Sequence, residues 1–406
     1  MSSTIWQARD FRAYLASTAA SGMALAMQQL LLSWVLIDLL ALPARQVGFI
    51  QALVGVPGVF LMLMGGVSAD RSDPRDMLIR IYLIAPIFPL FLFVMDRSGW
   101  FAVWSVMVWG FGMSITQAYS LPAQQAILNR ISGDEVQRAV TAATAAGFVV
   151  QIAGLTIAGQ MDRFGVAPVL LAQGLVLGLA ALATMGISSA PTAAPAARQS
   201  ALQGIVEGLR ATYRDRLVYN VLVINFVSSI FNAGSFITVF PFIVKRVYDG
   251  DALMLSLYMV IFYVGATISN TILLRFMPLL RPGKLFLLMQ LSRIAVIALV
   301  FIAEDIWVLT LGVFGWGLNM GVTSNLARSI VQESAQPEFR GRMLSVFSVG
   351  MIGSVPLGAV VLGLIVEYFG PLNALLPAMV VSVGLCAYGI LATQVWRYES
   401  AAGARN

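Results

Sequence analysis

Long runs of apolar residues, separated by short clusters that hold most of the charges, recur along the whole chain. A helix needs roughly 20 apolar residues to cross the hydrocarbon core of a membrane, and each run is about that long. The pattern therefore predicts an all-α integral membrane protein with twelve transmembrane helices. The predicted spans are 13–40, 46–67, 77–95, 100–121, 136–161, 166–187, 217–244, 253–274, 285–303, 306–327, 343–366 and 372–395.

The basic residues between the spans indicate how the chain is threaded. If the N-terminus is inside, 19 of the 25 Lys and Arg residues lie on the inner side, and Arg293 lies within a span. The five left on the outer side are Arg45, Arg97, Arg163, Lys245 and Arg246. This asymmetry fits the positive-inside rule and predicts a multi-pass protein of the cell (inner) membrane with both termini cytoplasmic. Arg9 to Arg12 leads directly into a span of full length, so no cleavable signal peptide is expected.

The longest polar segment, 188–216, falls between the sixth and seventh spans. It separates an N-terminal six-helix half (1–187) from a C-terminal six-helix half (217–396), which a cytoplasmic tail (397–406) follows. Its first part, SSAPTAAPAA, is rich in Pro and Ala and is expected to be extended. Its second part, ALQGIVEGLRATYR, has apolar residues on one helical face and predicts a helix at the inner membrane surface.

The two halves match each other at an offset of 204 to 205 residues. The matched pairs are Arg9 with Arg214, Asp10 with Asp215, Arg71 with Arg275, Pro74 with Pro278, Gly154 with Gly358, Gly159 with Gly363, Asp162 with Glu367, Phe164 with Phe369, and Gly165 with Gly370. One such pair means little, but several in register indicate a duplicated six-helix unit. Parallel repeats are typical of transporters, whose binding site lies between the halves near the bilayer midplane. We expect the glycines of the fifth and eleventh spans to let helices pack closely.

Composition narrows the class of protein further. Of the 406 residues, 59% are hydrophobic and 11% are charged, which is too apolar for a soluble protein. The sequence has no His and one Cys, Cys386, and so lacks imidazole bases, disulfides and His-containing metal sites. No metal or cofactor is expected. The net charge of +6 is attributed to the inner arginines, so nucleic acid is not an expected partner.

The loop after the second span reads GVSADRSDPR, from Gly66 to Arg75. It resembles the signature GxxxDRxGRR between helices 2 and 3 of the major facilitator superfamily, with Gly66, Asp70, Arg71 and Arg75 at matching positions. The resemblance implies two pseudo-symmetric six-helix halves that rock about a central site, and a gating role for these four residues. Pro74 stands where many members have Arg, so one cation of the usual charge relay is missing.

Asp70 lies at the cytoplasmic end of the second span, where a carboxylate can accept bonds from a helix N-terminus, pair with arginines and favour a closed cytoplasmic side. A solvated loop charge is the alternative, and we expect Asp73 and Asp76 to be solvated. Two further stretches, LPAQQAILNRISGDEVQRA and PEFRGRMLSVFS, resemble the branch of the superfamily that contains the enterobactin exporter and macrolide efflux proteins. The second stretch adds Arg340 and Arg342 to the gating residues.

Polar residues recur within the first, fourth, seventh and tenth spans, the helices that surround the cavity in this superfamily. The resemblance implies that they line the substrate cavity, and a hydrogen bond between helices is the alternative for each. The candidates are Gln28, Gln29, Ser114, Gln117, Asn225, Asn232, Trp316 and Asn319. Arg293, near the middle of the ninth span, is expected to snorkel or to pair with a group on another helix, with substrate contact as the alternative.

Proton coupling needs a titratable group, and no Asp or Glu lies in the middle of a span. Asp38, Asp162 and Glu367, at outer helix ends, are the candidates, with plain interface carboxylates as the alternative. We predict a monomeric secondary transporter that exports small amphipathic molecules, such as drugs or siderophore-like metabolites. Its expected partners are the bilayer, the small-molecule substrate and the proton motive force.

The alternatives to an exporter are an importer or facilitator, and an enzyme. An importer or facilitator of a neutral nutrient would use the same fold, and loss of substrate from preloaded cells would discriminate between them. An enzyme is not expected, because the sequence has no His, no paired intramembrane acids and no serine motif with a visible base. The phosphate-binding pattern GxxxxGK[ST] is also missing, so an ATP-driven pump is not supported.

Overall fold

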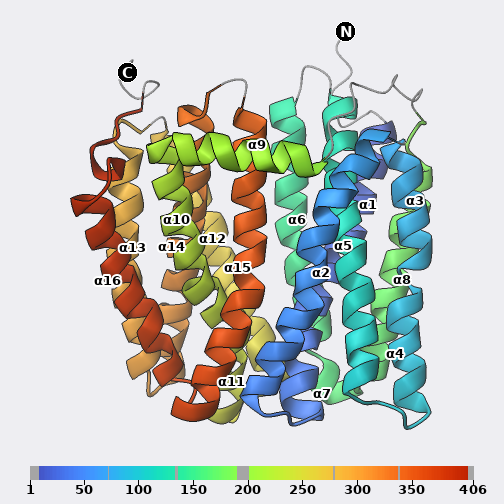
Figure 1. The fold of residues 1–406 in the computed structure, drawn as a ribbon. Coiled ribbons are helices and arrows are strands. Elements are labelled where there is room, and N and C mark those ends of the chain that lie inside the picture. The colour runs from blue at the N-terminus through green and yellow to red at the C-terminus, as the bar shows by residue number, and fades with distance from the viewer. Residues whose placement is uncertain are drawn as a thin grey trace. The chain divides into compact units, whose positions relative to one another are not determined.

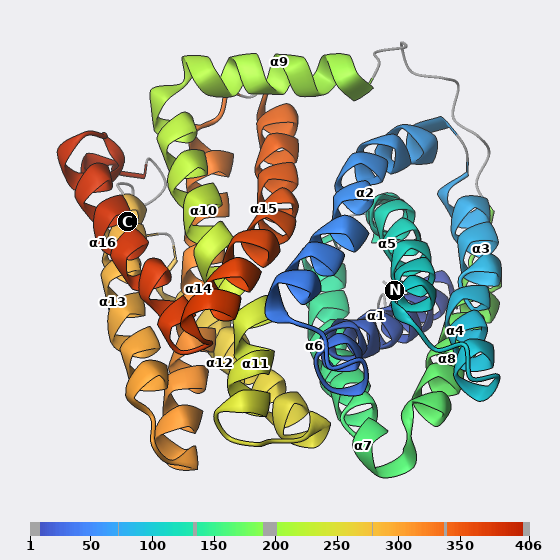
Figure 2. The same cartoon turned by 60° about the horizontal axis from the view of Figure 1, so that its bottom comes forward.

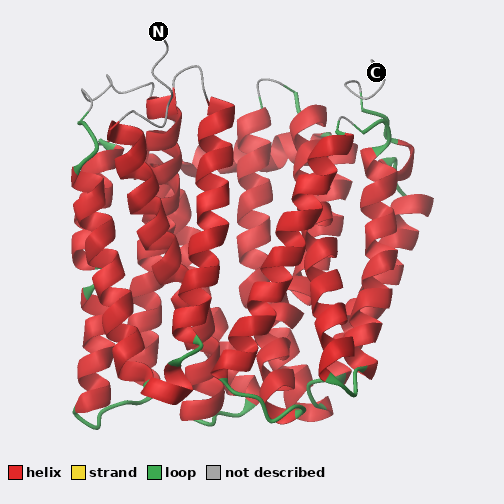
Figure 3. Cartoon of the chain, turned by 180° about the vertical axis from the view of Figure 1, so that it is seen from behind, coloured by secondary structure: helices red, strands yellow, loops and turns green. Residues whose placement is uncertain are grey.

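The computed structural model describes residues 9–71, 73–132, 136–189, 201–277, 279–336 and 339–400. Within these ranges every regular element is a helix (Figure 3). The contacts divide the chain into two compact units, each described here by itself. Unit 1 comprises Met1–Leu42, Leu53–Ala201 and Gly250–Leu257, and unit 2 comprises Pro43–Ala52, Leu202–Asp249 and Tyr258–Asn406.

The helices of the first sequence half follow the predicted spans closely. They are α1 (Arg9–Trp34) with the π-helical turn η2 (Val35–Leu39), α2 (Ala44–Arg71), α3 (Pro74–Ile84), α4 (Ile87–Arg97), α5 (Val103–Ser132), α6 (Val136–Ala158), α7 (Met161–Phe164) and α8 (Val166–Met185). In unit 1, α1 packs along α6 and α8, and α5 packs against α3 and α4 (Figure 2).

The second sequence half begins with α9 (Ala201–Arg214), the predicted surface helix. The remaining helices are α10 (Arg216–Gly234), η4 (Ser235–Val239), α11 (Phe240–Arg246), α12 (Ala252–Phe276), α13 (Pro282–Ile302), α14 (Ile306–Ser334), α15 (Arg340–Phe369), η5 (Asn373–Leu375), α16 (Leu376–Leu391) and η6 (Val395–Arg397). In unit 2, α10 packs on α15, and α13 packs on α14 and α16 (Figure 1).

Local sequence explains where several of these helices begin. Asp73, Asp215 and Asp305 precede α3, α10 and α14. The Asp73 carboxylate accepts one backbone N–H of the first turn, and the other two carboxylates accept two each. These donors have no partner within the helix, so a preceding carboxylate stabilises the start. Pro74 then occupies the first turn of α3, where its missing N–H costs nothing.

In the described part of the chain, ten helical segments are long and apolar enough to cross a membrane, where consecutive helices such as α1 and η2 count as one segment. They coincide with ten of the twelve predicted spans, and the other two predicted spans, 100–121 and 136–161, coincide with α5 and α6. α5 continues to Ser132, beyond Pro122, where the apolar run was expected to stop. Ala123, Ile127 and Leu128 are buried after the proline, and this burial favours the longer helix.

The duplicated glycines occupy equivalent places in the two sequence halves. A Cβ on Gly154 of α6 would collide with the carbonyl oxygen of Met23 on α1, and one on Gly358 of α15 would collide with that of Ile230 on α10. These helix pairs pack so closely that only glycine fits, as small residues allow in membranes. The backbone also repeats, because Gly165 and Gly370 both have positive φ, 85° and 83°.

Candidate functional site

Charged residues tie together one end of unit 1, the end predicted to face the cytoplasm. Arg75 of α3 donates from Nε to the carbonyl oxygen of Ile187 and from Nη2 to that of Met185 at 3.2 Å. Asp10 of α1 accepts from the backbone N–H of Ser188 at 3.1 Å. The starts of α1 and α3 are thereby held to the chain that leaves α8.

Asp73 is part of this network, and its expected solvation is wrong. Its Oδ1 accepts the backbone N–H of Arg75 at 3.0 Å and lies 3.4 Å from Nη1 of Arg130, at the end of α5. The Asp73 side chain is only 9% exposed. Arg130 also donates to the carbonyl oxygen of Ser188 at 2.9 Å. Arg130 belongs to the stretch LPAQQAILNRISGDEVQRA but was not among the predicted gating residues. It places a cation next to Asp73, the residue before Pro74, and many members of the superfamily have an arginine in place of Pro74.

The other gating candidates fall into two groups. Gly66, Asp70 and Arg71 lie in the last turns of α2, and their side chains are outside the described residues. Arg340 and Arg342 begin α15. Arg340 is exposed.

Arg342 connects α15 to the linker helix. Its Nη1 lies 2.5 Å from Oε2 of Glu207 on α9, and its guanidinium stacks over the Phe339 ring at 5.7 Å. Gly208 allows this close packing, because a Cβ there would lie 2.9 Å from the carbonyl oxygen of Arg342. In the described structure Arg342 therefore anchors α9.

The predicted cavity residues differ in how they are engaged. Asn232 and Trp316 are buried and hydrogen-bonded to each other, with Trp316 Nε1 donating to Asn232 Oδ1 at 2.7 Å. Trp316 also lies edge-on to Phe236 and Phe262, which stack at 3.7 Å in an aromatic cluster that was not predicted. Five other candidates are less enclosed. Gln28, Gln29, Ser114 and Asn225 are half-buried, and Gln117 is exposed.

Arg293 is fully enclosed in unit 2, with 2% of its surface exposed, so the expectation that it snorkels is wrong. Its partners are neutral and come partly from other helices, which confirms the expected pairing. Nε donates to Asn319 Oδ1 on α14 at 3.2 Å, and Nη1 donates to Ser228 Oγ on α10 and to Gln290 Oε1 at 2.8 Å. Asn319, a cavity candidate, also donates to the carbonyl oxygen of Met289 at 2.7 Å and is held in this cluster.

Asp162 and Glu367, two of the proton-coupling candidates, make equivalent contacts at the predicted outer ends. In unit 1, Asp162 accepts Trp34 Nε1 at 3.0 Å and the backbone N–H of Ala252, the first residue of α12, at 2.6 Å. In unit 2, Glu367 accepts the backbone N–H of Ala44, the first residue of α2, at 2.8 Å. A carboxylate at a helix N-terminus is stabilised by the unpaired N–H groups and the helix dipole.

Duplicated glycines accompany both carboxylates. A Cβ on Gly159 would collide with Ser256 of α12, and one on Gly363 would lie 2.8 Å from the carbonyl oxygen of Ala44. Each repeat thus provides one carboxylate and one glycine that together hold the first turn of a helix from the other sequence half. We call these contacts the outer clasps. Asp38, the third candidate, lies half-buried in η2.

Taken together, the described helices, their duplicated packing and their charged ends fit a membrane transporter of the major facilitator type. The chain matches the transmembrane secretion effector family over residues 5–403, and it belongs to that family. It is a multi-pass integral membrane protein and not an enzyme. No curated protein matches the sequence.

Solved structures support the fold. A bacterial homologue of the human lysosomal transporter Spinster, in an inward-facing and unoccupied conformation, aligns with TM-score 0.75 and 14% identity over 96% of this chain and 98% of its own. The nucleoside transporter NupG aligns with TM-score 0.75 and 14% identity over 96% and 99%. A POT family transporter in complex with 5-aminolevulinic acid aligns with TM-score 0.74 and 12% identity over 94% and 96%. At these identities the likeness concerns the fold alone.

Proposed function

We propose that this transporter exports small amphipathic molecules, such as drugs or siderophore-like metabolites, by alternating access driven by the proton motive force. The observation that carries the direction is membership, over residues 5–403, of a family described as transmembrane secretion effectors. The fold neighbours do not favour a direction, because they include a nucleoside transporter and a peptide transporter family.

The substrate class follows from the polar groups within the spans. Gln28, Gln117 and Asn225 offer amides, and no Asp or Glu lies in the middle of a span. Arg293 is occupied by Ser228 and other neutral partners. Such surroundings suit neutral or weakly charged molecules with apolar surface, because an unpaired ionic ligand would be costly to bury.

The outer clasps are our proposed coupling sites. Protonation of Asp162 or Glu367 would remove the charge that strengthens its bond to the start of α12 or α2, and so would release that helix. Arg163 and Asp251 are the nearest charged neighbours along the chain at the Asp162 clasp, and Arg45 is the nearest at the Glu367 clasp. The residues proposed to gate the predicted cytoplasmic end are Gly66, Asp70, Arg71, Arg75, Arg340 and Arg342.

Efflux from preloaded cells tests the proposal. Energised cells expressing the protein should lose a fluorescent amphipathic substrate faster than cells with an empty vector, and an uncoupler should abolish the difference. Accumulation of the substrate against its gradient would instead show import. Equal loss with and without the uncoupler would show facilitated diffusion, and the proposed coupling would be wrong.

A further inference from the structure

The linker helix α9 covers an apolar cavity in unit 2. It lies across the ends of α10 and α15 (Figure 1) and is fixed there by the Glu207–Arg342 ion pair. Beneath it is a cavity of about 570 Å³, within the size range of small-molecule sites. The apolar side chains that line it are those of Val206, Leu209, Leu222, Val223, Phe226 and Val346.

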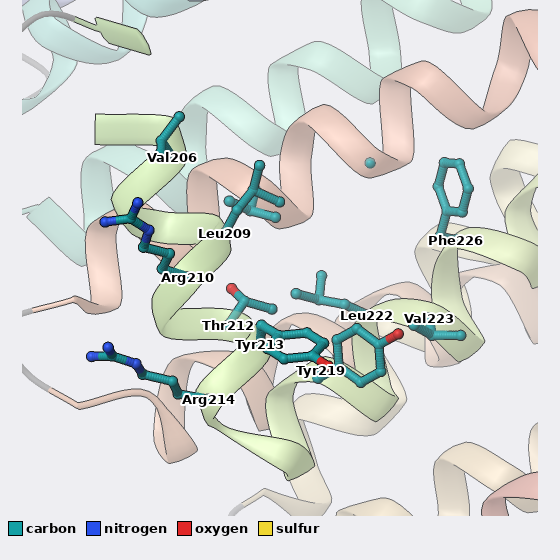
Figure 4. A pocket seen from close by; sticks show the side chains of 12 residues that line it. Val206, Leu209, Arg210, Thr212, Tyr213, Arg214, Tyr219, Leu222, Val223 and Phe226 are labelled. Carbon is teal, nitrogen blue, oxygen red and sulfur yellow. The ribbon is translucent and has the colours of Figure 1, made fainter. Parts of the chain in front are cut away.

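Cations gather on the other side of the same helix. Arg210 and Arg214 extend from α9 away from Val223 and Phe226 (Figure 4). They border the apolar cavity and also a second cavity of about 850 Å³, to which Arg216 and Arg342 contribute. Glu207 and Asp215 are the only acids that line this second cavity, so among the described residues four arginines face two carboxylates. An apolar space and a cationic space therefore meet along α9.

One buried hydroxyl points independently to a ligand. Thr212 lines the apolar cavity with 4% of its surface exposed, and its Oγ1 has no hydrogen-bond partner among the described residues. A buried hydroxyl without a partner is costly, and rotation of the Thr212 side chain toward the cavity would let this hydroxyl donate to an oxygen of a bound molecule and relieve that cost.

We propose that an anionic phospholipid of the inner leaflet occupies this site. One acyl chain fills the apolar cavity, the phosphate lies against Arg210 and Arg214, and a glycerol ester oxygen accepts the Thr212 hydroxyl. The placement of α9 at the inner membrane surface rests on the proposed topology. Bound lipid would hold α9 against α10 and α15, and so would make the linker sensitive to the anionic lipid content of the membrane.

Lipid binding to the purified full chain in detergent tests the site without any transport measurement. The probes are phosphatidylglycerol and phosphatidylcholine with identical acyl chains, titrated by native mass spectrometry and by thermal unfolding. Phosphatidylglycerol should bind more tightly and raise the melting temperature, and phosphatidylcholine should do so much less. Binding should weaken roughly fivefold for each arginine lost in Arg210→Gln and Arg214→Gln, because each cation contributes about 1 kcal/mol near an anionic lipid.

Matched variants identify the cause of any loss. Arg281→Gln with Arg328→Gln removes two charges that border neither cavity, and this variant should bind like wild type. Thr212→Val, which changes neither charge nor size appreciably, should weaken phosphatidylglycerol binding severalfold. Val223→Trp should fill the apolar cavity and block binding while all the arginines remain.

Three results would overturn the proposal. Equal binding of the two lipids would show that the headgroup charge is not recognised. Undiminished binding to the Val223→Trp variant would place the lipid elsewhere. Displacement of the lipid by a transported amphiphile at transport concentrations would make that substrate the occupant.

The proposed function and this site can fail independently. If cells show no export but lipid binding follows the pattern above, the proposed function is wrong and the lipid site stands.

Discussion

At the scale of single residues, Arg293 is a charged side chain buried among neutral groups, with 2% of its surface exposed. A charged side chain near the bilayer centre costs roughly 2.5–3.5 kcal/mol on insertion scales. Hydrogen bonds to oxygens of Ser228, Gln290 and Asn319 replace its water without neutralising its charge. These bonds connect α10, α13 and α14, so the arginine acts as a structural bridge among them.

Substitution of Arg293 should therefore affect stability before selectivity. Arg293→Met removes the donor to Asn319 Oδ1 and the stronger of the two donors to Gln290 Oε1, which keeps only the Ser228 hydroxyl at 3.2 Å, and should cost about 1–3 kcal/mol. Arg293→Lys keeps a charge and three donors and should cost less. Thermal unfolding of both variants, with transport of one neutral and one anionic substrate at matched expression, measures the difference. Selective loss of the anion in a stable Arg293→Met protein would show that the arginine contacts substrate.

Asp73 combines two roles that substitutions can separate. Asp73→Ala removes both the cap of α3 and the pair with Arg130, and should destabilise by about 0.5–2 kcal/mol. Asp73→Asn keeps a good capping group, and Arg130→Gln leaves the cap intact. Each should cost less than about 1 kcal/mol, because Arg130 is 28% exposed and water screens the pair. Thermal unfolding of the three variants gives the comparison, and equal losses for Asp73→Asn and Asp73→Ala would show that the charge matters and the cap does not.

At the scale of helices, the outer clasps explain why residues 43–52 group with unit 2 and residues 250–257 with unit 1. The first turn of α2 is held by Glu367, and the first turn of α12 is held by Asp162. The rest of α2 belongs to unit 1, which contains most of the first sequence half, and the rest of α12 belongs to unit 2, which contains most of the second. Release of both first turns would free the outer ends of α2 and α12 together.

Removal of the clasp charges should expose the start of α12. Ser256 is fully buried and donates to the carbonyl oxygen of Leu155 at 2.8 Å, so Ser256→Cys in a Cys386→Ala background reports on this contact. Asp162→Asn should raise the rate at which an impermeant thiol reagent labels this cysteine severalfold, because a charge-assisted bond becomes a neutral one. Glu367→Gln should also raise it if the two clasps open together.

A buried position far from the clasps supplies the control for this experiment. Ser382→Cys on α16 should stay slow to label in every background, because Ser382 is 2% exposed and contacts neither clasp. If Asp162→Asn raises the labelling rate and Glu367→Gln does not, the clasps act separately. If neither variant raises it, the clasps are not coupling sites.

The sequence predicted these helices well and their contacts less well. Apolar runs are local, so every predicted span coincides with helix. The sequence did not show the extension of α5 past Pro122, or the break within 77–95 that separates α3 from α4. Asp162 and Glu367 were predicted as candidate sites because they lie at the outer ends of spans. Their bonds to Ala44 and Ala252 could not be predicted, because the partners are backbone groups more than 80 residues away. The ion pairs of Arg130 with Asp73 and of Glu207 with Arg342 were not predicted either, because each joins side chains that are distant in the sequence and meet only through packing of the helices.

At the scale of the whole molecule, topology is the prediction on which direction and coupling depend. The positive-inside rule places residues 188–216 and both termini in the cytoplasm, because 19 of the 24 loop cations then lie inside. In a Cys386→Ala protein, Ser200→Cys should resist an impermeant thiol reagent added to intact cells, and Asp249→Cys should react. Cys386 forms no disulfide, and Cys386→Ala removes only its sulfur atom, so both variants should still fold. Permeabilised cells give the control, in which both cysteines should react. The reverse pattern in intact cells would place the linker outside the cell. Every charge assigned to the cytoplasmic side would then lie outside, and the outer clasps would face the cytoplasm.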